Sequence, residues 1–132
     1  MACLGVALAA CASQSRSVTS ASLETETQRQ TAALASETAA EIDKCVANIV
    51  AQQPPNPKTE PGAIADAALS QCTFWLSEYQ SNDGALVLAT DPNDSASFAD
   101  QHARRSKADM TQAARRRAIA IVQEQQARLA QQ

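Results

Sequence analysis

The chain has 132 residues and a formal net charge of −3, so we expect one domain, too short to enclose a substrate in a deep pocket. Its hydrophobic fraction of 45% is largely alanine, because Ala contributes 29 residues whereas Leu, Ile, Val and Phe together contribute 22. Aromatic residues make up only 3%, and there are three glycines and five prolines, which argues against a β-sandwich or barrel. Since Ala, Gln, Glu and Arg favour helices, the composition predicts an all-α fold with a thin core.

The first eleven residues, MACLGVALAAC, are all apolar or small. This stretch is too short to span a bilayer, which takes about 20 apolar residues, but it is typical of the end of a secretory signal. The tetrapeptide Leu8–Cys11 resembles the lipobox of bacterial lipoproteins. The resemblance implies cleavage before Cys11 and acylation of its thiol, which leaves residues 1–10 as a signal-peptide remnant. It also implies an outer-membrane location, because Ala12 rather than Asp follows the cysteine.

Two cysteines remain once the signal and the acylated residue are set aside. An even pair in an exported protein favours a disulfide, so we predict a Cys45–Cys72 bond; two buried free thiols are the alternative. Such a bond, which closes a loop of about 28 residues, would contribute roughly 3–4 kcal/mol to stability. Neither cysteine belongs to a CxxC motif and His102 is the only histidine, so we expect no metal and no cofactor.

Residues 11–20 are expected to form a polar tether after the lipidated cysteine, and residues 21–81 an antiparallel helical hairpin. The first helix should end near Gln52, before the Pro-rich link, and Thr59 is the expected N-cap of a second helix over 60–80. Helical spacing predicts two packing faces, one formed by Ile42, Cys45, Val46, Ile49 and Val50 and the other by Ile64, Ala68, Cys72, Trp75 and Tyr79.

The next residues predict a break and then a long helix. Asn82-Asp83-Gly84 is a turn and helix-stop pattern, so residues 82–91 are expected to form a connector, with 85–89 as a buried segment or a short helix. Asp91 is the expected N-cap, and Pro92 the first residue, of a basic helix over 92–132. The apolar side of that helix is shallow and consists of Phe98, Met110, Ala114, Ala118, Ile121, Val122 and Leu129.

Charge is divided between the two parts of the chain. Residues 12–100 carry 4 Lys/Arg against 12 Asp/Glu, a net −8, whereas residues 101–132 carry 7 against 2, a net +5. The cations that form two clusters on similar sides of the predicted helix are Arg104, Arg105, Lys107, Arg115, Arg116 and Arg117. They are candidates for binding an anionic partner: lipid, nucleic acid, or the acidic hairpin of the same chain. The simpler interpretation is a solvated face that is partly paired with that hairpin.

No catalytic motif is present, and we expect no enzyme activity. Glu37 and Glu41 place two carboxylates on one helical face, but such a pair is far more often a solvated surface than an acid–base site. The sequence therefore predicts a small lipoprotein of the cell envelope, facing the periplasm, with a structural or adaptor role toward a protein partner or the cell wall. Two alternatives are a phage lysis lipoprotein of the outer-membrane spanin kind and a cytosolic nucleic-acid-binding protein that uses the arginine clusters; nucleic acid is disfavoured by export and by the lack of interleaved aromatics.

Overall fold

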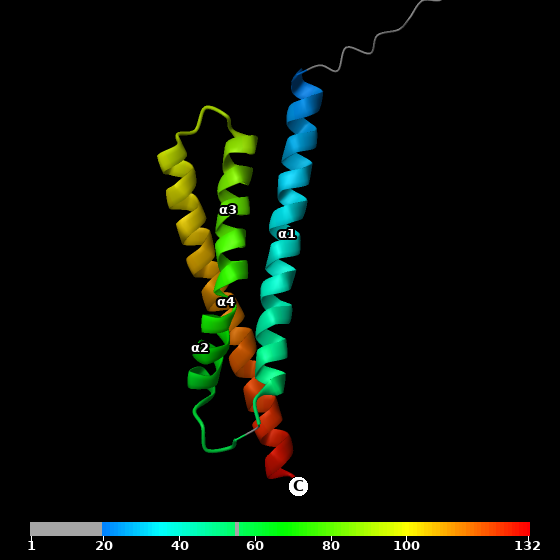
Figure 1. Ribbon diagram of the computed structural model, residues 1–132, viewed down its shortest axis with the longest axis vertical. Helices are drawn as coiled ribbons and strands as arrows, with labels where there is room; N and C mark the ends of the chain where they lie inside the picture. The colour runs from blue at the N-terminus through cyan, green and yellow to red at the C-terminus, as the bar shows by residue number, and fades with distance from the viewer. Residues whose placement is uncertain (1–19, 55) are drawn as a thin grey trace, which may run out of the picture.

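The computed structural model describes residues 20–54 and 56–132. Their backbone forms no strand and four helices: α1 (Ser20–Gln52), α2 (Pro61–Gln71), α3 (Thr73–Thr90) and α4 (Ala96–Ala130). In Figure 1, α1 and α4 extend along the molecule, while α2 and α3 follow one another end to end and run back antiparallel to α1. The predicted all-α fold, a helical hairpin followed by a long basic C-terminal helix, is confirmed.

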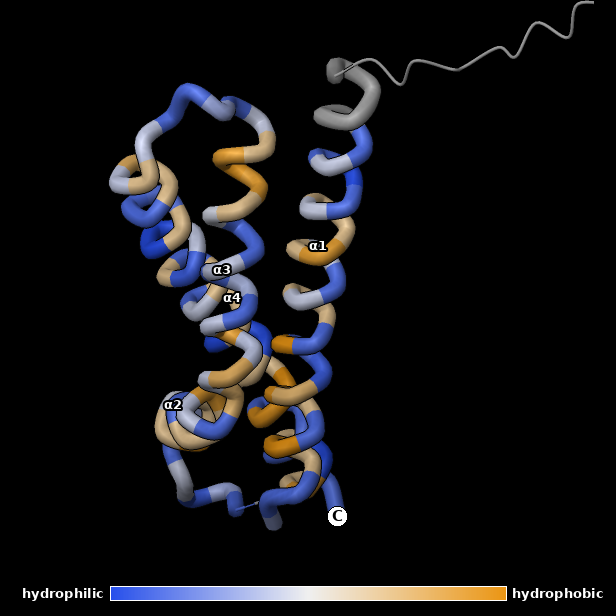
Figure 2. The backbone as a smooth tube through the Cα atoms, turned by 45° about the horizontal axis from the view of Figure 1, so that its top comes forward, coloured by the Kyte–Doolittle hydropathy of each residue, from blue (hydrophilic) through white to orange (hydrophobic). Residues whose placement is uncertain are grey.

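The apolar core lies where α1, α2, the first turn of α3 and α4 meet. α1 contributes the large buried side chains Ile42, Val46 and Val50, as its helical spacing predicts. Figure 2 shows the most hydrophobic segments of α1 gathered toward its C-terminal half. The other helices contribute mainly small residues: Ala65, Ala68, Leu69, Cys72, Leu76, Ala114, Ala118 and Val122. Because alanine has little side-chain volume, the helices must approach closely to exclude water, and the core is thin.

The α1–α2 link is fixed against α4. α1 ends at Gln52, just before the first proline of the link, as the sequence predicts. The side-chain amide of Gln126 donates hydrogen bonds to the backbone carbonyls of Asn56 and Thr59, both at 2.9 Å. The link therefore has tertiary partners of its own.

The predicted single helix over 60–80 is wrong, because the chain breaks at Cys72. This residue has φ −99° and ψ 17°, and it ends α2 and precedes α3. The neighbouring residues 70–74 contain no Gly or Pro, so the local sequence carries no break signal. The break coincides with the residue that is covalently joined to α1.

The predicted connector over 82–91 is also wrong, since α3 continues through Asn82-Asp83-Gly84 to Thr90. The polar side chains of this segment have partners on other helices instead of forming a turn. Asn82 Nδ2 donates to Thr38 Oγ1 on α1 at 2.8 Å, and Asp83 Oδ2 lies 3.0 Å from His102 Nδ1 on α4. These tertiary contacts override the local stop signal, and residues 85–89 form part of the last turns of α3.

Both predicted N-caps are displaced along the chain. Glu60, not Thr59, caps α2: its two carboxylate oxygens accept hydrogen bonds from the backbone N–H groups of Gly62 and Ala63. Ser95 caps α4 by accepting from the N–H of Phe98 at 3.1 Å, so this helix starts four residues after the expected Pro92.

The expected N-cap of α4 has a different role. Asp91 is the C-cap of α3, and its Oδ1 accepts from the N–H of Asn93 at 3.0 Å. This local turn uses the carboxylate that would otherwise start α4, because Asp side chains bond readily to the backbone two residues on.

Gly84→Ala is expected to raise the free energy of unfolding by about 0.5–1 kcal/mol, because glycine is a poor residue inside a helix. An added Cβ would lie 3.5 Å from Ala103 Cβ and 3.8 Å from the Ala99 carbonyl oxygen, which are ordinary contacts. Urea unfolding followed by circular dichroism measures the change.

The matched control for this prediction is Gly62→Ala. There the added Cβ would lie 2.8 Å from a Glu60 carboxylate oxygen and 2.9 Å from the Arg115 guanidinium, so the cap must move and we expect destabilisation. Neither glycine has a positive φ, so the two changes differ in surroundings and in helix position rather than in backbone strain. A loss of stability in Gly84→Ala would show that α3 and α4 do not tolerate an added methyl group.

Candidate functional site

The predicted disulfide is present between Cys45 and Cys72. It joins the buried face of α1 to the residue between α2 and α3, with the two Cα atoms 6.0 Å apart. Cys72 is fully buried and Cys45 is half-buried, so the bond belongs to the core cluster. The predicted lipidation site Cys11, the signal remnant and most of the tether lie outside the described residues.

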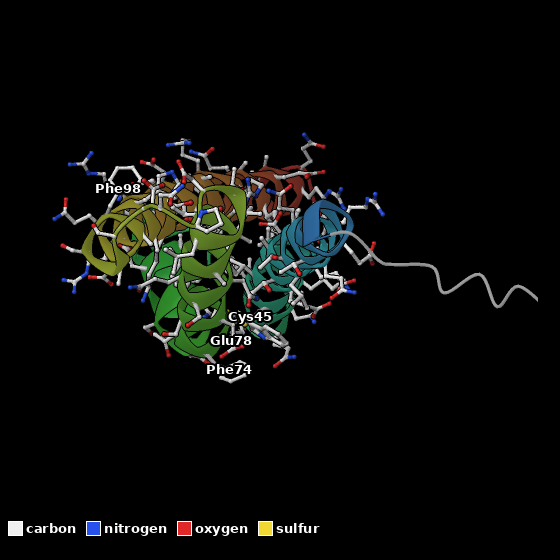
Figure 3. All side chains as sticks on the ribbon, turned by 90° about the horizontal axis from the view of Figure 1, so that it is seen from above. Cys45, Phe74, Glu78 and Phe98 are labelled. Carbon is white, nitrogen blue, oxygen red and sulfur yellow. A yellow bond between two sulfur atoms is a disulfide. The ribbon has the colours of Figure 1, made fainter. Side chains whose placement is uncertain are left out.

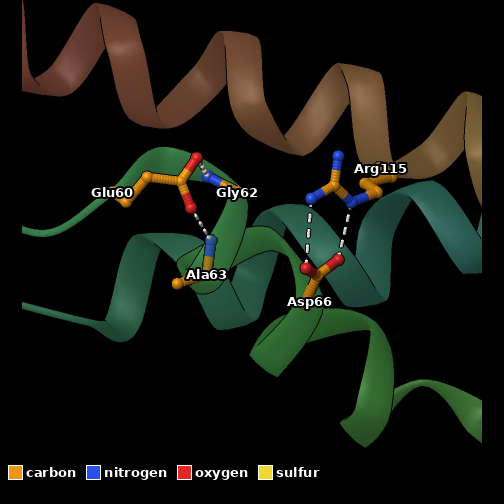
Figure 4. Close-up of polar contacts among 5 residues, drawn as sticks. All are labelled: Glu60, Gly62, Ala63, Asp66 and Arg115. Carbon is orange, nitrogen blue, oxygen red and sulfur yellow. Dashed lines mark hydrogen bonds and ion pairs between the residues drawn. The ribbon is translucent and has the colours of Figure 1, made fainter.

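Arg115 forms an ion pair between helices. Its Nε lies 2.6 Å from Asp66 Oδ1 on α2, and a terminal nitrogen lies 3.1 Å from Asp66 Oδ2, so the guanidinium binds the carboxylate at both oxygens (Figure 4). These hydrogen bonds lower the pKa of Asp66 and raise the pKa of Arg115. The pair fixes the middle of α4 to α2, beside the Glu60 cap.

Arg117 binds the other side of the hairpin. Its Nε and a terminal nitrogen both donate to Asp43 Oδ1 on α1, at 2.9 and 2.5 Å. Arg115 and Arg117 are two residues apart on α4, so they diverge and bind different helices. The arginine triplet is therefore divided, and two of its three cations pair with carboxylates of the acidic hairpin of the same chain.

The remaining cations of the predicted anion-binding set are on or near the outer face of α4. Arg104 pairs with Asp100 of its own helix at 2.8 Å. Arg105 and Arg116 are exposed and Lys107 is half-buried, and none of the three forms an ion pair with a described side chain. Three of the six candidate cations therefore form no ion pair with the described side chains, and they are spaced along about three turns of α4: Arg105, Lys107 and Arg116.

Asp66→Asn is expected to destabilise the protein at neutral pH and to have little effect in acid. The folded-state pKa of Asp66 lies below its usual 3.8 because Arg115 binds the ionised form. A lowered folded pKa adds stability above the unfolded pKa, and this stability is lost as the pH falls through the folded pKa. The urea midpoints of wild type and variant should therefore differ at neutral pH and converge well below pH 3.8.

The control for this prediction is Asp109→Asn. Asp109 is exposed on α4 and has no ion pair with the side chains that the structure describes, so its replacement should give no such convergence. A difference between wild type and Asp66→Asn that is the same at both pH values would contradict the role assigned to the ion pair.

A surface groove of about 630 Å³ lies between α1 and α3. It is lined by Leu34, Glu37, Thr38, Glu41, Trp75, Glu78 and Asn82. Polar groups along the groove satisfy one another: the Thr38 hydroxyl donates to the Leu34 carbonyl at 2.6 Å and accepts from Asn82. The groove therefore combines apolar side chains with three carboxylates. Its two uncharged polar side chains, Thr38 and Asn82, are already hydrogen-bonded to each other.

Phe74 extends this surface. Its ring meets the ring of Trp75 edge to face, with centroids 5.0 Å apart, and the residue is 63% exposed. In Figure 3, Phe74, Glu78 and Cys45 lie on one side of the bundle, and Phe98 lies on the other. The sequence identifies the carboxylate pair Glu37 and Glu41, but it does not identify Glu78 or the exposed ring of Phe74. Its periodicity places Trp75 on a packing face of the core.

The only histidine lies between α3 and α4. His102 is close to Asp83 and to the exposed ring of Phe98, with centroids 6.5 Å apart, at the edge of a hollow of about 350 Å³. No serine or cysteine among the described side chains hydrogen-bonds to it. Ser106, one turn further along α4, is 3.1 Å from the Tyr79 hydroxyl instead. The structure assigns this histidine an interhelical contact.

The described part of the chain contains no group of three or more His, Cys, Asp or Glu side chains placed to hold a metal ion. None of its helices combines the length and hydropathy needed to cross a membrane. No family model, curated protein or solved structure matches the chain.

Proposed function

We propose that this protein is a small envelope lipoprotein with an adaptor role, anchored through Cys11 at the periplasmic face of the outer membrane. The observation that carries the proposal is the Cys45–Cys72 disulfide. A bond of this kind persists in oxidising compartments such as the periplasm and is rare in the cytosol. It agrees with the lipobox-like Leu8–Cys11 sequence, which by itself is a short motif.

The adaptor role is supported by the surface of the bundle. Most of its few large apolar side chains are used in a thin core, yet Phe74 and Leu34 remain exposed beside a groove. Side chains of this kind, next to polar rims, mark surfaces that contact other proteins. The tether of residues 11–20 would hold this surface close to the membrane, where an envelope partner or the cell wall is within reach.

Intact mass measurement of the protein from its native host tests the proposal. We expect a chain that begins at an acylated Cys11, in which Cys45 and Cys72 are alkylated only after reduction. A Cys11→Ser variant should lose the acyl mass and keep the disulfide. A chain that still begins at Met1, with every thiol open to alkylation, would overturn the proposal.

A further inference from the structure

The face of the bundle formed by α1 and α3 exposes large apolar side chains that the core does not use. Leu34 on α1 is 49% exposed and Phe74 on α3 is 63% exposed, while Trp75, whose ring contacts that of Phe74, is half-buried in the groove. Aromatic side chains at the centre of a surface are the groups that most often dominate protein binding. This chain has only four Phe, Tyr or Trp residues, and two of them lie here.

The groove is acidic along both sides. Glu37 and Glu41 project from α1 and Glu78 from α3, and no Lys or Arg lines it. One cation lies next to it: Lys44 pairs with Glu41 at 2.5 Å, which leaves Glu37 and Glu78 without an ion pair among the described side chains. An occupant with positive charge would therefore be favoured over a neutral or acidic one.

The dimensions of the groove suit a helix. Its lining residues run from position 34 to 41 on α1 and from 75 to 82 on α3, which is seven steps on each helix. At 1.5 Å per residue this corresponds to about 10 Å, or two turns of an occupying helix. Because α1 and α3 are antiparallel, Leu34 and Trp75 lie at opposite ends of the groove, and the carboxylates of Glu37, Glu41 and Glu78 lie between these ends. A groove between two helices that offers both apolar and charged side chains is suited to an amphipathic helix.

We propose that the groove between α1 and α3 binds a basic amphipathic helix of a partner protein. The apolar side chains of that helix would pack on Leu34, Phe74 and Trp75, and its Lys or Arg side chains would face Glu37 and Glu78. This inference names the partner chemistry of the adaptor role and rests on that part of the proposed function, but not on the lipid anchor. The basic helix of the same molecule is not the occupant, because α4 lies on the opposite side of the bundle (Figure 3).

The only tryptophan of the chain lies in the groove, so its fluorescence reports directly on occupancy. The probe is a peptide of leucine and lysine, about five helical turns (about 18 residues) long, with leucine at i, i+3, i+4 and i+7. The matched peptide has glutamate in place of lysine. The full chain, with its disulfide formed, should show a saturable change in Trp75 emission with the lysine peptide at micromolar concentration, and none with the glutamate peptide.

Two variants and two controls locate the binding. Phe74→Ser and Glu78→Lys should each weaken binding of the fluorescently labelled lysine peptide about tenfold. Phe98→Ser and Glu124→Lys change the same residue types on α4 and should bind as the wild type does. Phe74 and Glu78 are exposed, and circular dichroism of each variant verifies that the bundle is retained.

Three outcomes would overturn the inference. Equal affinity for both peptides would mean that the carboxylates of the groove do not select a basic partner over an acidic one. Equal weakening by the groove variants and the α4 controls would place binding elsewhere. Sedimentation of the chain as a dimer that Phe74→Ser dissociates would show that a second copy occupies the groove. A Met1-initiated chain in the mass experiment would refute the anchor and leave the peptide result standing, so the two failures are distinguishable.

Discussion

Replacement of both Cys45 and Cys72 by alanine should lower the free energy of unfolding by about 3–4 kcal/mol. The bond joins residues 27 positions apart, so in the unfolded chain it removes the entropy of that loop. The total free energy of unfolding is typically about 5–15 kcal/mol, so the loss of this bond removes a large share of the stability of a core this rich in alanine. Urea unfolding at neutral pH, followed by circular dichroism, measures the difference.

Reduction of the wild type provides the matched test of the same bond. It should move the urea midpoint to that of the double variant, whereas Cys11→Ser should leave the midpoint unchanged. If the reduced and oxidised wild type unfold at the same urea concentration, the disulfide does not contribute the stability assigned to it.

The second large effect is expected for Ile42→Ala, with a loss of about 2–5 kcal/mol. Ile42 is fully buried in the C-terminal half of α1 and is among the largest fully buried side chains, so truncation leaves a cavity that the surrounding alanines cannot fill. Leu34→Ala is the control on the same helix, because Leu34 is half-exposed and its loss should change stability by less than about 0.5–1 kcal/mol. Similar losses in the two variants would mean that the core is not centred on Ile42.

The first helix and the disulfide are the features that the sequence predicts best, and the physical reason is local. The Ile42, Val46 and Val50 spacing follows the helical period, and the prolines after Gln52 end the helix at a defined place. Cys45 and Cys72 lie one on each predicted packing face, so a disulfide between them requires only that the two helices be antiparallel.

The breaks in the second half of the hairpin could not be predicted, because tertiary contacts decide them. The Asn82-Asp83-Gly84 pattern ends a helix when its side chains bond locally, but here Thr38 and His102 take those bonds. Conversely, the chain breaks at Cys72, where no turn residue is present. Local patterns were outweighed in both places by partners that are distant in the sequence.

The interaction surface was only partly predictable for a similar reason. The pair Glu37 and Glu41 is visible in the sequence, but Glu78 joins it only once α3 is placed against α1. Trp75 fits the periodic packing face, whereas Phe74 is the adjacent residue, about 100° further around the helix, and periodicity alone does not distinguish an exposed ring from a buried one. The division of the arginine triplet between Asp66 and Asp43 likewise depends on which helices flank α4.

The position of the disulfide also determines how the molecule responds to mechanical load. A pull at the N-terminal end of α1 can peel this helix away from α3 only as far as Cys45, where the covalent bond passes the force to the α2–α3 junction. The loop of 27 residue steps behind it is shielded and cannot extend. Stretching of single molecules should therefore give a final contour length about 90 Å shorter when oxidised than when reduced. Equal lengths would show that the bond does not bear the force.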